Sequence, residues 1–242
     1  MLNVIKMDLY RLFKSKVTWI ILIILGLMAV TIMNTAHSEY EYLINHPENF
    51  ENVPAKYAND PMYSLNSVFD IYYFYNRIIY NSFIGLFISV FTIIFAGSEN
   101  STGFIKNIAG QPSIRYRTML SKCFSIFVFT SMILILDLAM AMICSKLFFG
   151  YVSIGYSISN MAAFTLTQLL LNTALGIVAM CISELIRNPA VSMAISVIIS
   201  IGGLRLITSQ VDKLIGLRSF SFTSQLITVN IAGLPLLLII VV

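Results

Sequence analysis

The residue in this sequence with the clearest capacity for chemistry is a carboxylic acid inside an apolar run. Asp137 lies between Leu136 and Leu138, in the middle of a run that extends from 118 to 149. A charged side chain at the centre of a bilayer costs about 2.5–3.5 kcal/mol on insertion scales, unless it is protonated, paired or in contact with water. Asp137 therefore has either a structural polar contact with another helix or a role in a transport path or its gating.

Polar and small residues also recur at every fourth position in the two apolar runs that follow. Small and hydroxyl residues at this spacing let helices approach closely and form hydrogen bonds across a bundle. The pattern has two interpretations: helix packing, or the polar wall of a translocation path or of an interface with a second copy of the chain. The residues are Gln168, Asn172 and Gly176, with Thr165 close by, and then Ser192, Ser196 and Ser200.

Motifs of enzymes and metal sites are missing from the sequence. It contains no G-x-x-x-x-G-K-[ST] segment to hold nucleotide phosphates, no H-E-x-x-H and no G-x-S-x-G. The cysteines, Cys123, Cys144 and Cys181, show no metal-binding spacing, and His37 and His46 are expected to be solvated loop residues. We therefore expect no catalytic, cofactor-binding or metal-binding residue in this chain.

The composition is that of a membrane protein. Hydrophobic residues make up 58% and charged residues 11% of the sequence, and the mean hydropathy is +0.85. Soluble domains average about 45–50% apolar and 25% charged residues. Several apolar runs reach the ~20 residues that a helix needs to cross ~30 Å of hydrocarbon, so we expect an all-α integral membrane protein rather than a β-barrel. The net charge of +4 is small, which makes nucleic acid an unexpected partner.

The apolar runs predict six transmembrane helices in a single membrane domain that covers 1–242. Because backbone polar groups in lipid must pair within their own segment, each run is expected to form one continuous helix. The third run is longer than the hydrocarbon is thick, so its helix must tilt or project into water. The predicted spans are 17–36, 76–97, 118–149, 157–182, 190–207 and 225–242.

Residues 1–16 are expected to form an amphipathic helix that lies along the membrane interface. Apolar residues recur there at spacings of three and four, and basic residues occupy the remaining surface. The alternative is a basic leader that only satisfies the positive-inside rule. The apolar residues are Leu2, Ile5, Leu9, Leu12 and Phe13, the basic ones are Lys6, Arg11 and Lys14, and Trp19 marks the interface.

Residues 37–75 form a predicted external loop. The segment contains three prolines, six acidic residues and one lysine, and its last residues are aromatic. Lys and Arg are more frequent in the segments that this arrangement places in the cytoplasm, which favours a cytoplasmic N-terminus. An acidic, aromatic loop suits a cationic amphipathic peptide, by charge attraction and ring contact. The acidic residues expected to contact such a substrate are Glu39, Glu41, Glu48 and Glu51.

A polar and basic segment between the second and third spans is the most specific feature of the chain. The segment is too short to fold alone, yet it contains helix-breaking residues and charges at distinct positions. This pattern favours a contact surface over a spacer. The alternative is an ordinary cytoplasmic loop rich in positive charge. The segment begins with Gly97-Ser98-Glu99, continues with Gly103-Phe104-Ile105-Lys106-Asn107, breaks at Gly110-Gln111-Pro112 and presents Arg115, Arg117 and Lys122.

With this segment, the order of parts resembles the permease subunits of type-2 ABC exporters. The resemblance is strongest to the short bacterial permeases that export peptides or confer immunity to them, of the phenol-soluble-modulin-exporter or lantibiotic-immunity kind. It covers nearly the whole chain and implies that 1–16 is the elbow helix and that 98–113 holds the coupling helix, which fits a groove on a separate ATP-binding subunit. The residues implied to contact that ATPase are Glu99, Gly103, Phe104, Ile105, Lys106 and Asn107, with Arg115 and Arg117 near them.

The resemblance implies a transport function without enzymatic activity in this chain. Two permease copies, identical or related, would work with two ATPases, which bind ATP and Mg²⁺, and would move an amphipathic substrate, such as a peptide toxin or antimicrobial peptide, out of a bacterial cell. One alternative is a membrane-anchored sensor or assembly protein that transports nothing. A third function, ion-coupled secondary transport around Asp137, is disfavoured because the other spans show no further ionisable residue and no discontinuous-helix pattern.

Overall fold

The computed structural model describes residues 2–45, 71–81, 83–101, 112–150, 158–186 and 188–200 of the chain. These residues are almost entirely helical and include no strand, which confirms the all-α class. The helices are α1 (Leu2–Lys14), α2 (Lys16–Asn45), α4 (Ile71–Asn81), α5 (Ile84–Ser101), α7 (Pro112–Cys144), the π-helix η3 (Ser145–Phe149), α8 (Ile158–Ile186) and α9 (Pro189–Ser200).

Three helices are long and apolar enough to cross a membrane, so the chain is a membrane-embedded protein. A fourth span exists if the bent pair of α4 and α5 counts as one. Helix α9 covers only the first part of the fifth predicted span, 190–207, and the sixth, 225–242, lies outside the described residues. The three long spans are Lys16–Tyr42, Arg117–Phe149 and Met161–Ile186.

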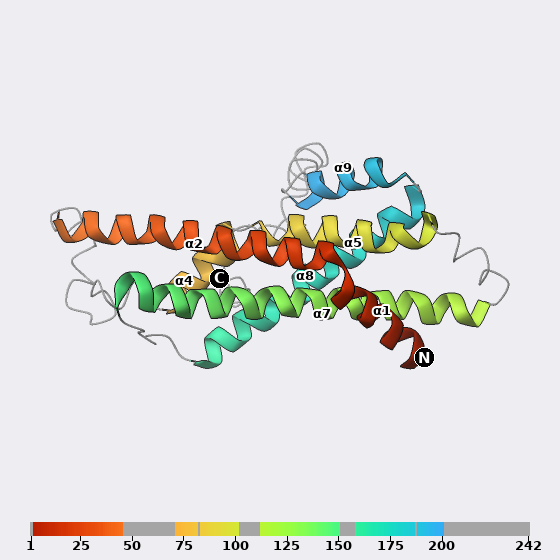
Figure 1. Cartoon of the computed structure of the whole chain (residues 1–242), viewed down its shortest axis with the longest axis horizontal. Helices are drawn as coiled ribbons and strands as arrows, with labels where there is room; N and C mark the ends of the chain where they lie inside the picture. Colours follow the sequence, from red (N-terminus) through yellow and green to blue (C-terminus); the bar gives the residue numbers. More distant parts are fainter. Residues whose placement is uncertain are drawn as a thin grey trace, which may run out of the picture.

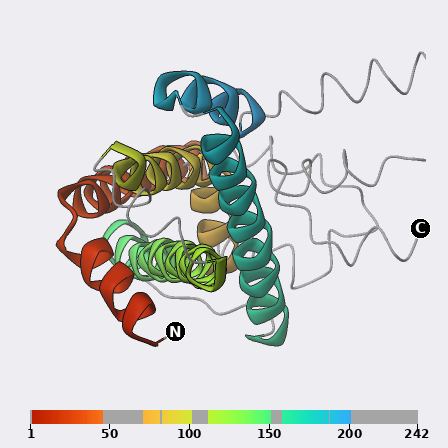
Figure 2. The ribbon, with the colours of Figure 1, turned by 90° about the vertical axis from the view of Figure 1, so that its right-hand side faces the viewer.

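The long helices form an elongated bundle with two distinct ends (Figure 1). The end of α5 and the beginning of α7 lie at the same end as α1, and the end of α2 lies at the other. Viewed along the bundle, α1 and α8 flank α7 on opposite sides, and α9 packs beside α5 (Figure 2). We call these two ends the α1 end and the opposite end.

Helix α2 continues to Asn45, nine residues past the end of the predicted first span. No glycine or proline interrupts the chain between Gly26 and Pro47, so nothing in the backbone ends the helix earlier. His37, expected to be solvated, packs against aromatic residues instead: its ring centroid lies 5.4 Å from that of Phe149. The sequence around His37 could not reveal this contact, because the partner ring belongs to η3, more than 100 residues away.

The segment predicted as a continuous second span is divided into two helices. Helices α4 and α5 meet at an angle of 48°. Phe83, between them, has a positive φ of 51°, a conformation that is strained for a bulky residue and incompatible with a continuing right-handed helix. A broken helix is one of the two features whose absence disfavoured secondary transport in the sequence analysis, and that reason no longer holds.

Helix α7 begins at Pro112, six residues before the start of the predicted span. Proline suits the first turn of a helix, since its φ is already helical and its missing N–H has no partner to lose. At ~1.5 Å per residue, the 33 residues of α7 extend about 50 Å, roughly 20 Å more than the hydrocarbon core. A helix of this length must tilt or project beyond the hydrocarbon, the two alternatives that the length of the apolar run allows.

Candidate functional site

The interior of the bundle contains polar side chains at the depth of the membrane. Asp137 of α7 and the Gln168 and Asn172 side chains of α8 are at most 1% exposed. In lipid, a polar group without a partner costs more than in a solvated position, because no water replaces the lost hydrogen bonds. We call Asp137, Gln168 and Asn172, with the neighbouring Tyr75 and Thr165, the polar core.

Asp137 is the most isolated member of the polar core. Neither of its carboxyl oxygens has a hydrogen-bond partner among the described residues. Asp137 and Thr165 are both electrostatic neighbours of the Tyr75 hydroxyl, which is itself buried. The Tyr75 ring also contacts Phe164, with centroids 6.0 Å apart. Asp137 thus lies on the side of α7 where α4 and α8 meet, and the described residues give it no structural polar contact.

Two amide side chains of α8 are hydrogen-bonded to each other, but each keeps one polar atom without a partner among the described residues. The Asn172 Nδ2 group donates to the Gln168 backbone oxygen at 2.9 Å and to the Gln168 Oε1 atom at 3.3 Å. The Gln168 Nε2 and Asn172 Oδ1 atoms have no partner in the part of the chain that the structure describes. These atoms can therefore bind a polar group, such as water, an ion or a substrate group, inside the bundle.

Gly176 extends the same face of α8, at a point where neighbouring helices approach closely. A Cβ atom built there would lie 2.6 Å from the Ile126 Cγ2 atom of α7 and 3.1 Å from the Ile88 Cγ2 atom of α5. Three helices meet at a position that only glycine can occupy without displacing a neighbour. The small-residue pattern in α8 is therefore a packing pattern at Gly176, whereas at Gln168 and Asn172 it forms the polar core.

The serine pattern of α9 faces α5. Ser192 and Ser196 are buried, and the Ser200 hydroxyl lies 2.7 Å from the Ser89 hydroxyl and 3.3 Å from the Gly85 carbonyl oxygen. Helix packing within one chain, the first of the two interpretations, accounts for Ser200. The contact also lies at the beginning of α5, next to the break between α4 and α5.

At the α1 end, a buried carboxylate fastens α1 to the bundle. Asp8 is fully buried and accepts a hydrogen bond from the Ser121 hydroxyl of α7 at 2.5 Å. Arg11 lies 3.5 Å from the other carboxylate oxygen of Asp8 and places its guanidinium over the Phe95 ring of α5. Sequence analysis assigned Asp8 no role, although it is the one acidic residue in an otherwise basic amphipathic helix.

We expect the Ser121→Ala substitution to lower the free energy of unfolding by about 1.5–3 kcal/mol, the usual value of a hydrogen bond to a charged group. Thermal unfolding of the purified chain measures the effect. Ser131→Ala is the matched control, because the Ser131 hydroxyl lies on the same helix and donates to the Phe127 carbonyl oxygen of that helix. Equal stability of the two variants would show that Asp8 does not hold α1 in place.

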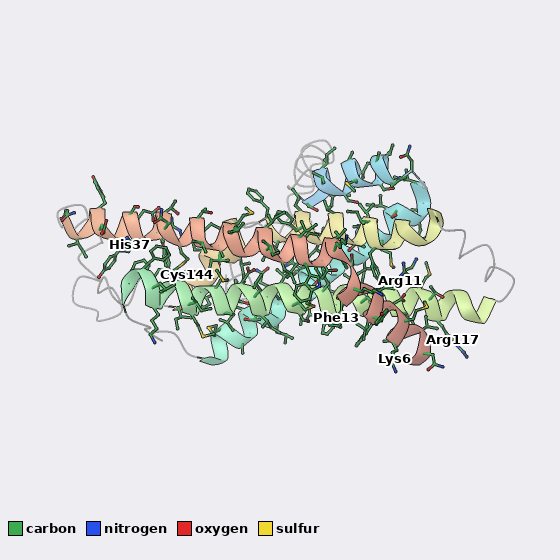
Figure 3. All side chains as sticks on the ribbon, in the orientation of Figure 1. Lys6, Arg11, Phe13, His37, Arg117 and Cys144 are labelled. Carbon is green, nitrogen blue, oxygen red and sulfur yellow. The ribbon has the colours of Figure 1, made fainter. Side chains whose placement is uncertain are left out.

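A second ion pair at the α1 end joins α7 to α8. The Lys122 Nζ atom lies 3.1 Å from a Glu184 carboxylate oxygen, and Lys122 is only 3% exposed. Lys122 follows Ser121, the partner of Asp8, so this ion pair lies at the same end of the bundle as α1. Figure 3 shows Lys6, Arg11 and Arg117 at this end and His37 and Cys144 toward the other.

At the opposite end, the predicted substrate residues have partners within the chain. Glu39 accepts two hydrogen bonds from the Arg77 guanidinium, at 2.5 and 2.6 Å, and a Glu41 oxygen lies 3.9 Å from the His37 Nε2 atom. Arg77 also donates to the Tyr73 hydroxyl at 2.6 Å. Glu39 thus joins α2 to α4, a structural role that its position in a presumed loop did not suggest. Glu48 and Glu51 lie outside the described residues.

The residues implied to contact an ATPase lie mostly outside the described part of the chain. Gly103, Phe104, Ile105, Lys106 and Asn107 belong to the undescribed segment 102–111, which connects α5 with α7. Glu99 lies in the last turn of α5 and Arg115 in the first turns of α7. Arg117 is exposed at the α1 end, so the helix ends that hold these three residues lie together.

Within the described residues, no group of three or more His, Cys, Asp or Glu side chains could hold a metal ion. No protein-family model matches the chain, and the comparisons with curated proteins and with solved structures found no similar protein. The function must therefore be inferred from the groups of the site itself. These are a buried carboxyl group, two amides with polar atoms that lack a described partner, and a broken helix pair.

Proposed function

We propose that this chain is the permease subunit of an ATP-driven exporter that moves an amphipathic peptide across a bacterial cell membrane. The observation that supports it best is the arrangement of the α1 end. Helices α5 and α7 end and begin there, and they flank the polar segment 102–111, whose motifs resemble a coupling helix. A partner that moved this segment would act directly on two long helices.

The contacts of α1 make such a movement mechanically effective. Asp8 joins α1 to α7 through Ser121, and Arg11 joins it to α5 through Phe95. Both helices connected by 102–111 are thus tied to one amphipathic helix. If an ATPase displaced this segment, α1, α5 and α7 would move together. Helix α5 would transmit the movement to the α4–α5 break and the polar core. ATP and Mg²⁺ would be bound by the partner, and a second permease copy would complete the path.

The test is co-purification of the chain with the ATPase encoded beside it, followed by ATP turnover in lipid. We expect wild type to retain an active ATPase, and the Glu99→Ala, Phe104→Ala and Lys106→Ala triple variant to lose at least about tenfold in affinity, since a few central residues dominate such interfaces. Lys146→Ala is the control, because Lys146 is exposed in η3, which follows α7 at the end of that helix far from 102–111.

If wild type purifies alone, the exporter assignment falls. Binding of the ATPase without stimulated ATP turnover would instead favour the non-transporting sensor or assembly protein. If no ATPase binds, ion-coupled transport becomes the leading function, because Asp137 is buried without a described partner and the α4–α5 pair is a broken helix.

A further inference from the structure

A cavity of about 310 Å³ lies where α1 turns into α2 and faces the last turns of α5. One wall carries hydroxyl and basic groups, those of Tyr10, Arg11 and Lys14. The other is apolar and consists mainly of Phe91, Ile94 and Phe95. A cavity that is cationic on one side and apolar on the other has the chemistry of an amphiphile site.

The basic wall of the cavity contains two cationic side chains, Arg11 and Lys14. Arg11 interacts with Asp8 at 3.5 Å, and the other oxygen of Asp8 already accepts the Ser121 hydroxyl. The Lys14 Nζ atom lies 3.2 Å from the Tyr10 hydroxyl, a neutral group. Lys14 thus brings a positive charge to this wall, and its described hydrogen bond is to a neutral group. An anionic group would balance the charge and accept hydrogen bonds from Lys14 and Tyr10.

The apolar wall is rigid at its base and open at its edge. Phe91 stacks on Phe129 of α7, with ring centroids 3.7 Å apart, and on Phe95 at 5.4 Å. Ile94, beside them, is 40% exposed. A hydrocarbon chain that leaves the cavity along Ile94 would therefore enter the surrounding lipid.

The cavity lies at the level of the lipid headgroups. Trp19, two residues after the cavity-lining Val17, is half exposed and donates its indole N–H to the Phe13 carbonyl oxygen at 2.9 Å. Tryptophan prefers the membrane–water interface, where its ring is in the apolar region and its N–H finds a polar partner. The basic wall is thus at the depth where a phospholipid presents its phosphate.

We propose that this cavity binds one anionic phospholipid, with its phosphate against Lys14, Arg11 and Tyr10 and one acyl chain along Ile94 and Phe95. Charge complementarity selects the anionic headgroup, and the opening toward lipid selects a membrane-borne ligand over a soluble one. The cytoplasmic leaflet, where the positive-inside rule places α1, is the leaflet rich in anionic lipid. The inference does not depend on transport and adds a lipid site that clamps α1 to α5.

Native mass spectrometry of the full-length chain tests the proposal. The chain is taken from bilayers that contain phosphatidylglycerol and phosphatidylcholine with identical acyl chains. We expect wild type to retain phosphatidylglycerol in preference, and Lys14→Gln to lower that preference about fivefold, the factor that corresponds to ~1 kcal/mol per basic residue beside an anionic lipid surface. Lys6→Gln is the matched control: it removes the same charge from an exposed position nearer the N-terminus of α1.

A second variant keeps the test independent of charge. Ile94→Trp fills the cavity from its exposed edge and should reduce retention of both lipids. Inorganic phosphate alone should not displace the bound lipid, because it cannot use the apolar wall. Equal retention of the two lipids by wild type would overturn the proposal, and so would equal losses in Lys14→Gln and Lys6→Gln, which would indicate a diffuse surface charge effect.

Discussion

Replacement of Asp137 by leucine is expected to stabilise the chain and to abolish the transport proposed above. Asp137 is fully buried, and its carboxyl oxygens have no partner among the described residues. An unsatisfied buried polar group costs about 1–3 kcal/mol, so an apolar side chain of similar size should raise the free energy of unfolding by a similar amount. A residue that destabilises the fold in this way is retained for a function, and loss of that function is the second expected result.

Thermal unfolding and transport in reconstituted vesicles measure the two effects of this change. Thr130→Val is the matched control, because Thr130 is also buried on α7 and its hydroxyl donates to the Ile126 carbonyl oxygen of the same helix. Asp137→Asn keeps the shape and removes the acid, so its activity tells whether the proton or only the polarity matters. A large loss of stability in Asp137→Leu would contradict the prediction and reveal a hidden partner for the carboxyl group.

Replacement of Gly176 by alanine is expected to destabilise the bundle by about 1–3 kcal/mol, the usual cost of overpacking a core. The added methyl group would lie 2.6 Å from the Ile126 Cγ2 atom and 3.1 Å from the Ile88 Cγ2 atom. Both isoleucines are buried, and β-branched side chains in helices have one strongly preferred rotamer, so neither can turn away. The helices must separate, which would also open the polar core one turn away.

Gly26→Ala is the control for this prediction. Gly26 lies within α2, and a Cβ atom there would meet nothing within 4 Å. Because alanine is favoured over glycine by up to ~1 kcal/mol inside a helix, the control variant should be unchanged or slightly more stable. Thermal unfolding in the same detergent compares the two variants. If Gly176→Ala matches Gly26→Ala, the three helices do not meet as closely as described.

The local sequence pattern predicted those helices whose formation depends on neighbouring residues. The spacing of apolar and basic residues in 1–16 predicted the helix α1, and the long apolar runs predicted α2, α7 and α8. The charge distribution grouped residues that the structure brings to one end, such as Lys122 and Glu184. These successes share a reason: helix formation and membrane insertion depend on residues a few positions apart, which a linear pattern records.

Breaks and partners were not predictable in the same way. The run 76–97 contains no proline, and Phe83 is a bulky residue for a positive φ. Asn81, Ser82 and Gly85 beside it are only weak signals of a helix break, and the apolar pattern continues past them. Likewise, Asp8 and Ser121 are 113 residues apart, so only the packing of α1 on α7 could reveal their hydrogen bond.

The sequence by itself determined that this is a helical membrane protein with one amphipathic helix, one isolated intramembrane acid and a regular polar pattern on α8. Only the tertiary structure decided where those residues lie: Gly176 is a contact point of three helices, Asn172 and Gln168 are hydrogen-bonded to each other, and Asp137 is buried without a hydrogen-bond partner among the described residues. Composition and periodicity determine which segments enter lipid and form helices, because both depend on solvent and on residues in neighbouring turns. A buried polar group depends instead on which helix lies opposite, and that is settled only when the whole bundle packs.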